Sequence, residues 1–275
     1  MKRIFIAIAA VGSLLTTGAF AADLAPMYTK APPPVVAVYD WTGFYIGGNI
    51  GYSWGRSNDT STLTNGAGTV LFTSFGKTNL DGVVGGGQVG YNWQTQNWVW
   101  GLEADIQGTD EKGSRNFVCP LGICTVFTGV FFNAPPPGPP VPVALNQKID
   151  WFGTVRGRAG VLVSPKVLLY ATGGLAYGGV NTNETIGVVP VGFSSTTTNV
   201  GWTVGAGIEG VIGGNWTAKL EYLYVDLGRV SGSFLTTIPA LGGGFLTSSY
   251  SSRITDNVLR VGVNYKFSGP VVTKY

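Results

Sequence analysis

The sequence predicts an all-β protein: an eight-stranded antiparallel transmembrane up-and-down β-barrel with long extracellular loops and short periplasmic turns. Three observations lead to this fold class. The chain opens with a secretory signal peptide, and its apolar side chains alternate with small or polar ones along eight segments. After the signal, no apolar stretch is long enough for a transmembrane helix, so a closed wall of strands is expected to satisfy the backbone in the membrane.

Residues 1–21 have the three parts of a signal peptide. A basic start at residues 1–3 precedes an apolar run at residues 4–15. Ala19 and Ala21 then supply the small residues of a cleavage site, which we place after Ala21. The chain is therefore predicted to be exported across an inner membrane.

The barrel is predicted over residues 41–267, between a proline-containing periplasmic leader at 22–40 and a periplasmic tail at 268–275. In the first strand Phe44, Ile46 and Ile50 fall on one face, while the residues between them fall on the other. The same period of two recurs in seven further segments. The predicted strands are 44–54, 83–94, 98–107, 149–161, 167–177, 199–209, 216–224 and 259–267.

Short and long connections alternate along the chain, as expected of an up-and-down barrel. The short ones are residues 94–97, the turn at Ser164-Pro165 and residues 213–215. The predicted long loops are Gly55 to Leu80, Thr109 to Lys148, Val180 to Thr197 and Gly228 to Ser252. Short turns of such barrels face the periplasm, so both termini are predicted to be periplasmic. In the fourth strand, Ile149 is predicted to face outward and Asp150 inward.

Tryptophans are predicted to form aromatic girdles at both membrane interfaces. The periplasmic girdle comprises Trp41, Trp93, Trp98, Trp100 and Trp216. The outer girdle comprises Trp54, Trp151 and Trp202. A secreted β-sandwich would bury its tryptophans and turn polar residues outward, so the apolar outer face and charged inner face favour a membrane barrel.

The inward positions carry equal numbers of acidic and basic residues. They are Glu103, Asp105, Glu209, Glu221, Arg156, Arg158, Lys219 and Arg260. Counting across the short turn at 213–215 puts Glu209 opposite Lys219, and Glu221 falls at the depth of Arg260. An eight-stranded barrel is only wide enough to be filled by side chains, which favours a paired-charge network that closes the lumen. A narrow pore lined by these residues is the alternative.

Three segments carry a family resemblance: DWTGFYIGGNIG at residues 40–51, GYN at 90–92 and RVGVNYKF at 260–267. In these the chain resembles the opacity-type porin family of small Gram-negative outer-membrane β-barrel proteins. The resemblance implies an eight-stranded barrel with surface-exposed, often immunogenic loops, in proteins sometimes described as porins. Such barrels usually end on the aromatic residue of the last strand, whereas this chain continues past Phe267 to Tyr275.

The residue types argue against catalysis and cofactor binding. The chain has no His, which the barrels resembling omptin proteases, lipid A deacylases and lipid A palmitoyltransferases use as a general base. Residues 85–90 match the glycine pattern of a dinucleotide site, but no helix follows to hold a pyrophosphate. We therefore expect no enzyme activity, no cofactor and no metal.

Cys119 and Cys124 are predicted to form a disulfide in the second long loop, because an even cysteine count in an exported chain indicates pairing. The bond is expected to cap a hairpin in which 117–118 face 125–126. Residues 134–140 are proline-rich and are interpreted as an exposed spacer.

Three functions remain open from the sequence: a structural and surface-display barrel, a low-conductance porin for small solutes, and an adhesin acting through its loops. The expected partners are outer-membrane lipid and lipopolysaccharide, the barrel-assembly machinery during biogenesis, and a surface ligand at the loops. The low net charge of +3 gives no reason to expect nucleic acid.

Overall fold

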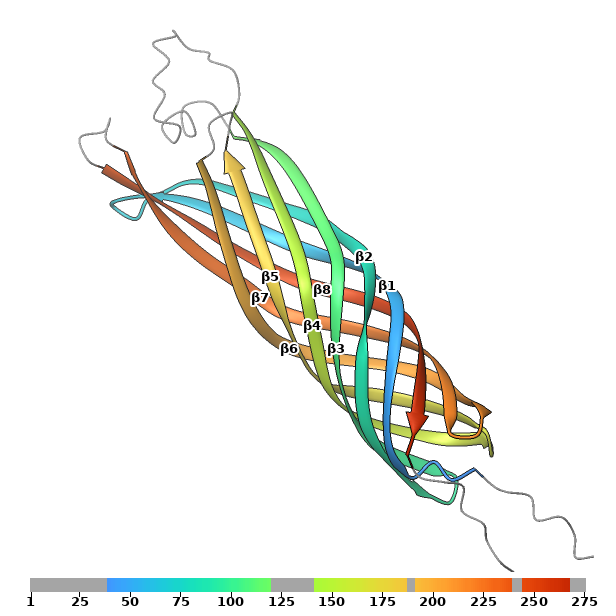
Figure 1. Cartoon of the computed structure of the whole chain (residues 1–275). Helices are drawn as coiled ribbons and strands as arrows, with labels where there is room; N and C mark the ends of the chain where they lie inside the picture. The colour runs from blue at the N-terminus through green and yellow to red at the C-terminus, as the bar shows by residue number, and fades with distance from the viewer. Residues whose placement is uncertain (1–38, 120–140, 187–190, 239–243, 268–275) are drawn as a thin grey trace, which may run out of the picture. The chain divides into compact units, whose positions relative to one another are not determined.

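The computed structural model describes residues 39–119, 141–186, 191–238 and 244–267 of the chain. They form one closed antiparallel barrel in which each strand pairs with its neighbours in sequence and β1 pairs with β8 (Figure 1). The strands are β1 (Gly43–Asn65), β2 (Val70–Thr95), β3 (Trp98–Cys119), β4 (Val141–Ser164), β5 (Val167–Ile186), β6 (Val191–Gly213), β7 (Trp216–Ile238) and β8 (Gly244–Lys266). The predicted fold class is confirmed.

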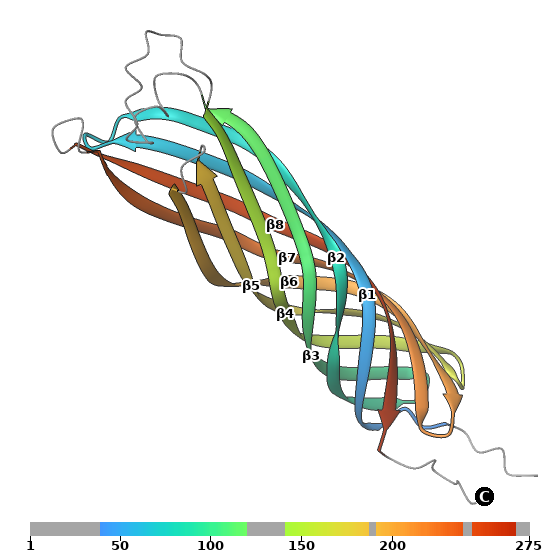
Figure 2. The ribbon, with the colours of Figure 1, turned by 45° about the horizontal axis from the view of Figure 1, so that its top comes forward.

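Three two-residue turns lie at one end of the barrel, which we call the turn end. They join β2 to β3 at 96–97, β4 to β5 at 165–166 and β6 to β7 at 214–215. The start of β1 and the end of β8 lie side by side at the same end, where Tyr45 is the register partner of Lys266 (Figure 2). The opposite end is called the loop end. No helix in the described part of the chain is long and apolar enough to cross a membrane.

The strands continue far into the segments predicted as long loops. β1 reaches Asn65 and β2 begins at Val70, so only residues 66–69 remain between them. Pairs such as Ser57 with Thr78 keep the strand ladder intact there. These segments are rich in Ser and Thr on both faces, so the contrast between an apolar and a polar face disappears while backbone pairing continues. Apolar alternation therefore marks the membrane band and not the full length of the strands.

At the beginning of the fourth predicted strand, the inward and outward residues are exchanged relative to the prediction. A β-bulge separates Ile149 from Trp151, and Ile149 is buried inside the barrel with 1% of its surface exposed. Asp150 lies on the outer face, where it pairs with Lys148 at 2.6 Å. The extra residue of a bulge shifts the alternation by one position, which explains the wrong prediction for both side chains.

The hairpin predicted beside the cysteines is also corrected. Phe117 pairs with Val143 and Val118 with Pro142, so residues 117–118 face β4 and not 125–126. Cys119 ends β3 and is the register partner of Val141. Cys124 and the proline-rich spacer lie outside the described residues, and the disulfide stays a prediction. The signal peptide, most of the leader and the tail lie outside them too.

Candidate functional site

The eight charged residues predicted to face inward all lie inside the barrel. Their side chains are no more than 4% exposed, and every one of them belongs to an ion pair. The register places Glu209 opposite Lys219, as the turn length predicts, and Glu221 opposite Arg260, in agreement with the similar depth predicted for them. We call these eight residues the lumen charge network.

Arg156 of β4 forms the centre of the lumen charge network. Its guanidinium lies 2.5 Å from Glu103 Oε1, 2.9 Å from Asp105 Oδ2 and 3.1 Å from Glu221 Oε1. Arg260 approaches Glu221 Oε2 at 2.6 Å and Asp105 Oδ2 at 2.9 Å. Two arginines and three carboxylates from four strands thus cross-link the lumen, and a charge at this depth is tolerated because it is paired and hydrogen-bonded.

The remaining charges extend the network toward the turn end. Lys219 Nζ donates to both carboxylate oxygens of Glu103, each at 3.0 Å. Although Glu209 faces Lys219 across the ladder, its ion-pair partner is Arg158, at 2.7 Å between Nη2 and Oε2. Asn264 also donates to Glu209, at 2.8 Å. Which charges form ion pairs therefore depends on how far each side chain extends across the lumen, and not on strand register alone.

Two tyrosines that the sequence analysis did not assign complete the network. The Tyr45 hydroxyl donates to Glu103 at 2.7 Å, and the Tyr170 hydroxyl donates to Glu221 at 2.9 Å. The Tyr170 ring also lies under the Arg158 guanidinium, 4.0 Å from its carbon to the ring centroid. Each ring occupies space left open by a glycine, since a Cβ on Gly90 or Gly207 would fall within 2.6 Å of the Tyr45 or Tyr170 ring.

We expect Gly207→Ala to destabilise the barrel by about 1–3 kcal/mol, because the added methyl displaces Tyr170 from Glu221 and Arg158. Urea unfolding of the refolded protein in detergent micelles measures this. Gly157→Ala is the matched control, since the nearest atom to its Cβ lies 3.9 Å away. Equal stability of the two variants would show that the glycine is not needed to seat the Tyr170 ring.

Above the charge network the lumen is filled by apolar side chains, which the sequence analysis missed. On β8, Val258 and Ile254 point inward beyond Arg260, and both are 0% exposed. The members of this apolar layer are Leu80, Val84, Ile149, Phe152, Ala176, Val180, Leu223, Val225, Leu227, Val230, Tyr250, Ile254 and Val258. The signal was available for all members except Ile149 and Val230, which lie beyond bulges, because the others keep the inward parity of the predicted strands or continue it into the predicted loops.

Two carboxyl groups lie beside the apolar layer. Glu111 of β3 and Asp256 of β8 are 0% and 3% exposed, and the Thr109 hydroxyl donates to Glu111 at 3.2 Å. The Ser53 hydroxyl also donates to Asp256.

A second polar cluster fills the lumen toward the loop end. Asp59 accepts hydrogen bonds from Ser57 at 2.6 Å, Ser252 at 2.6 Å and Thr78 at 2.7 Å, and from the Gln147 amide at 3.2 Å. Among the described residues, no group of three or more His, Cys, Asp or Glu side chains is arranged to hold a metal ion. Layers of different polarity thus follow one another along the lumen.

Trp41 does not belong to an aromatic girdle, contrary to the prediction. Its side chain is buried, with 1% exposed, among Tyr39, Val99, Leu168 and Tyr170 at the turn end. The segment before β1 therefore packs into the mouth of the barrel at the turn end. The girdle assignment rested on the position of Trp41 at the barrel end, whereas the alternation of β1, with Phe44 and Ile46 outside, gives Trp41 an inward face.

Polar contacts hold this segment in place. The Trp41 amide donates to Gln94 Oε1 at 2.8 Å and its indole N–H donates to the Pro165 carbonyl at 3.4 Å. Lys266 donates to the carbonyl of Asp40, and its ammonium lies 4.4 Å from the centroid of the Tyr39 ring. Burial raises the pKa of the Tyr39 hydroxyl, which keeps it neutral. We call Tyr39 to Thr42 the turn-end cap.

The other tryptophans lie on the outer face of the barrel. Trp93, Trp98, Trp100 and Trp216 are near the turn end, and each is about half exposed. Trp54, Trp151 and Trp202 lie farther along the strands toward the loop end, where Trp151 packs edge-on against Tyr177 with centroids 6.0 Å apart. Exposed Ile, Leu and Val side chains such as Ile50, Leu102 and Val261 occupy the face between these levels. An apolar outer band bounded by aromatic rings suits contact with lipid.

A family model described as outer membrane protein beta-barrel domain matches residues 7–267. The chain belongs to this outer-membrane barrel family. Its location in the outer membrane as a β-barrel follows from the membership and from the closed barrel with an apolar outer face. The opacity-type subgroup is a finer assignment than this match provides.

Within the outer-membrane barrel family, the chain is 34% identical over 271 residues to a 31 kDa outer-membrane immunogenic protein of Brucella melitensis. The alignment covers 97% of this chain and 100% of that protein. A 22 kDa outer membrane protein of Rhizobium leguminosarum is 29% identical, over 85% of this chain and 82% of that protein. The solved structure of Neisserial surface protein A covers 82% of this chain and 98% of its own, with a TM-score of 0.38 and 12% identity.

Proposed function

We propose that this protein is a closed outer-membrane barrel that has a structural and surface-display role, and that it does not conduct solutes. The observation that carries the proposal is the lumen charge network, in which Arg156 bridges Glu103, Asp105 and Glu221 with no exposed side-chain surface of its own. An ion crossing the barrel at this level would have to break several buried, charge-assisted contacts at once.

The layers on either side of the network support the same proposal. Trp41 covers the turn end, while side chains such as Phe152 and Leu223 fill the lumen above the charges. An apolar constriction resists the entry of water as well as of ions. Closure therefore does not depend on one set of residues.

A display role is supported by the relatives, which are named as outer-membrane immunogenic proteins. We infer that the loop end faces outside the cell and that both termini are periplasmic, because short turns of bacterial barrels are periplasmic. This arrangement fits the opacity-type porin family, although a closed lumen makes the word porin inappropriate here. No catalysis is part of the proposal, since the chain has no His for a general base.

We expect refolded protein in planar lipid bilayers to give no steady channel openings at high protein load. Glu221→Ala and Arg156→Ala are measured beside it, because each unbalances the lumen charge network. Steady wild-type openings whose ion preference shifts in these two variants would overturn the closed-barrel proposal in favour of a low-conductance porin. Lys112→Ala, which changes an exposed lysine 2.6 Å from Asp110, is the control for a lumen origin of any current.

A further inference from the structure

Four neighbouring strands carry a row of polar and basic side chains on the outer face, just beyond the aromatic rings nearest the loop end. Asn58 of β1 pairs with Lys77 of β2 and with Arg253 of β8, and Arg253 pairs with Arg229 of β7. Neighbouring strands lie about 4.8 Å apart, so this row spans about 14 Å. Arg56 lies on the same face, two residues before Asn58. We call Arg56, Lys77, Arg229 and Arg253 the basic wall.

Most of the positive charge of the basic wall is not neutralised by the part of the chain that the structure describes. Arg56, Lys77 and Arg229 make no ion pair with the residues that the structure describes. Arg253 is held at 2.6 Å by Asp226, a carboxylate that is 2% exposed. On the wall formed by β3 and β4 the pattern differs, since the exposed cations there each have an acidic partner at 2.6 Å: Lys112 with Asp110, and Lys148 with Asp150.

A further acidic group on the same face, Asp81, is already engaged by another residue. Asp81 lies four residues from Lys77 on β2 and accepts a hydrogen bond from the Tyr52 hydroxyl at 2.7 Å. Three unpaired cations on β7, β1 and β2, within a row of four neighbouring strands, repel one another, at a cost that an anion bound from outside would remove. The basic wall is therefore complementary to an anionic group.

Toward the membrane, the basic wall borders the lipid-facing aromatic residues. Trp54 lies on β1 two residues before Arg56, and its ring packs 6.5 Å from that of Tyr222. Asn58 is four residues beyond Trp54. With about 3.3 Å of rise per residue and a strand tilt of about 40°, the row lies about 10 Å beyond the Trp54 ring, at the level of lipid headgroups.

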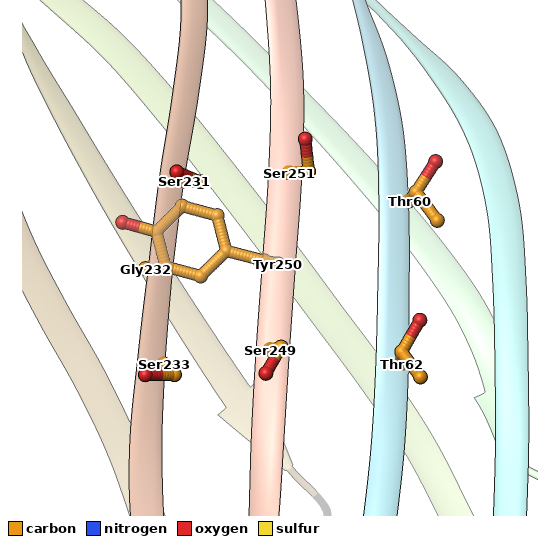
Figure 3. Close-up of a pocket in the computed structure, with 8 residues that line it drawn as sticks. All are labelled: Thr60, Thr62, Ser231, Gly232, Ser233, Ser249, Tyr250 and Ser251. Atoms are coloured by element: carbon orange, nitrogen blue, oxygen red, sulfur yellow. The ribbon is translucent and has the colours of Figure 1, made fainter. Parts of the chain in front are cut away.

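Away from the membrane, the same strands present two rows of hydroxyl groups (Figure 3). Ser231, Ser251 and Thr60 are register partners in one row, and Ser233, Ser249 and Thr62 form the next. All six line an open groove of about 460 Å³. An apolar and aromatic band, a row of cations and two rows of hydroxyls thus follow one another outward along β7, β8 and β1.

We propose that the basic wall binds the phosphate groups of lipopolysaccharide, with the acyl chains on the apolar band below it and the sugars against the hydroxyl rows above it. A phosphorylated, acylated saccharide has the same order of apolar, anionic and hydroxyl-rich parts. The inference rests on the proposed orientation, with the loop end outside the cell, because that places the wall in the outer leaflet.

The test measures binding of purified diphosphorylated lipid A to refolded protein in detergent micelles. The triple variant Arg56→Ser, Lys77→Ser, Arg229→Ser is expected to raise the dissociation constant about tenfold or more, since each cation near an anionic lipid surface contributes separately. The double variant Lys112→Ser, Lys148→Ser is the matched control and is expected to bind like the wild type. Rising salt is expected to weaken wild-type binding.

Two further arms identify the source of the anion. Lipid A without its phosphates is expected to bind the wild-type protein weakly, with a dissociation constant similar to that of diphosphorylated lipid A for the triple variant. Equal binding of both lipids, equal binding by wild type and triple variant, or equal loss in the control would each overturn the proposal. Displacement of lipid A by millimolar inorganic phosphate would reassign the wall to free anions and overturn it as a lipid site. None of these readouts depends on conductance, so their failure leaves the closed-barrel proposal intact.

Discussion

Arg156→Met is expected to lower the free energy of unfolding by about 3–5 kcal/mol, because it removes one cation from a buried network and leaves its carboxylate partners incompletely compensated. Glu103, Asp105 and Glu221 all lie within 3.1 Å of the Arg156 guanidinium. Arg260 and Lys219 are already committed to the same carboxylates, so neither is free to replace Arg156. Urea unfolding of the refolded barrel in micelles measures the loss.

Two companion variants test whether the loss of stability in Arg156→Met comes from the loss of a buried charge. Lys112→Met breaks an ion pair whose two side chains are 61% and 70% exposed, and the expected change is no more than about 1 kcal/mol. Combining Arg156→Met with Glu221→Leu removes one charge of each sign, so the double variant is expected to be more stable than the sum of the two single losses predicts. Strict additivity of the two losses would contradict a shared network. If Arg156→Met does not refold, recovery of folding in the double variant would also show that Arg156 and Glu221 belong to one network.

The membrane band of the fold could be predicted from the sequence because lipid imposes a sharp contrast between the two faces of each strand. Phe44, Ile50 and Val261 are exposed on the outer face, while Glu103 and Arg260 are buried inside. The short turns, and the placement of Lys219 opposite Glu209, followed from counting residues. Where the strands leave the lipid, as at Ser57 and Thr78, both faces are polar and the alternation that predicts strands is lost.

The errors have specific physical causes. A bulge after Ile149 changed the parity of one strand end, and no residue type in that segment marks it. Trp41 was assigned to a girdle because it lies at the barrel end, although the alternation of β1 gives odd-numbered residues the inner face. Prediction of the lumen charges succeeded because an unpaired charge cannot face lipid, so every charge in the band had to point inward. Their partners could not be predicted, since a long Arg side chain reaches across the lumen to strands that are distant in register.

Trp41→Ala is expected to cost about 3–5 kcal/mol of stability, as is usual for truncating a fully buried large side chain. The indole is 1% exposed, packs 5.2 Å from the Tyr39 ring and donates to the Pro165 carbonyl, so the variant loses both packing and a hydrogen bond. Because the lumen charge network and the apolar layer remain in place, the same variant is expected to stay silent in planar bilayers. The cap would then be a stabilising element and not a gate.

Trp98→Ala is the matched control for the cap, since Trp98 is on the outer face near the same end and is 53% exposed. Its truncation is expected to cost less than that of Trp41, because about half of the Trp98 ring contacts lipid or detergent and not protein in the folded barrel. Trp41→Phe keeps an aromatic ring in the cavity but cannot donate to Pro165, and an intermediate stability is expected. Unfolding of Trp41→Ala at the wild-type urea concentration would refute the cap, whereas channel openings in that variant alone would make the cap the barrier to conduction.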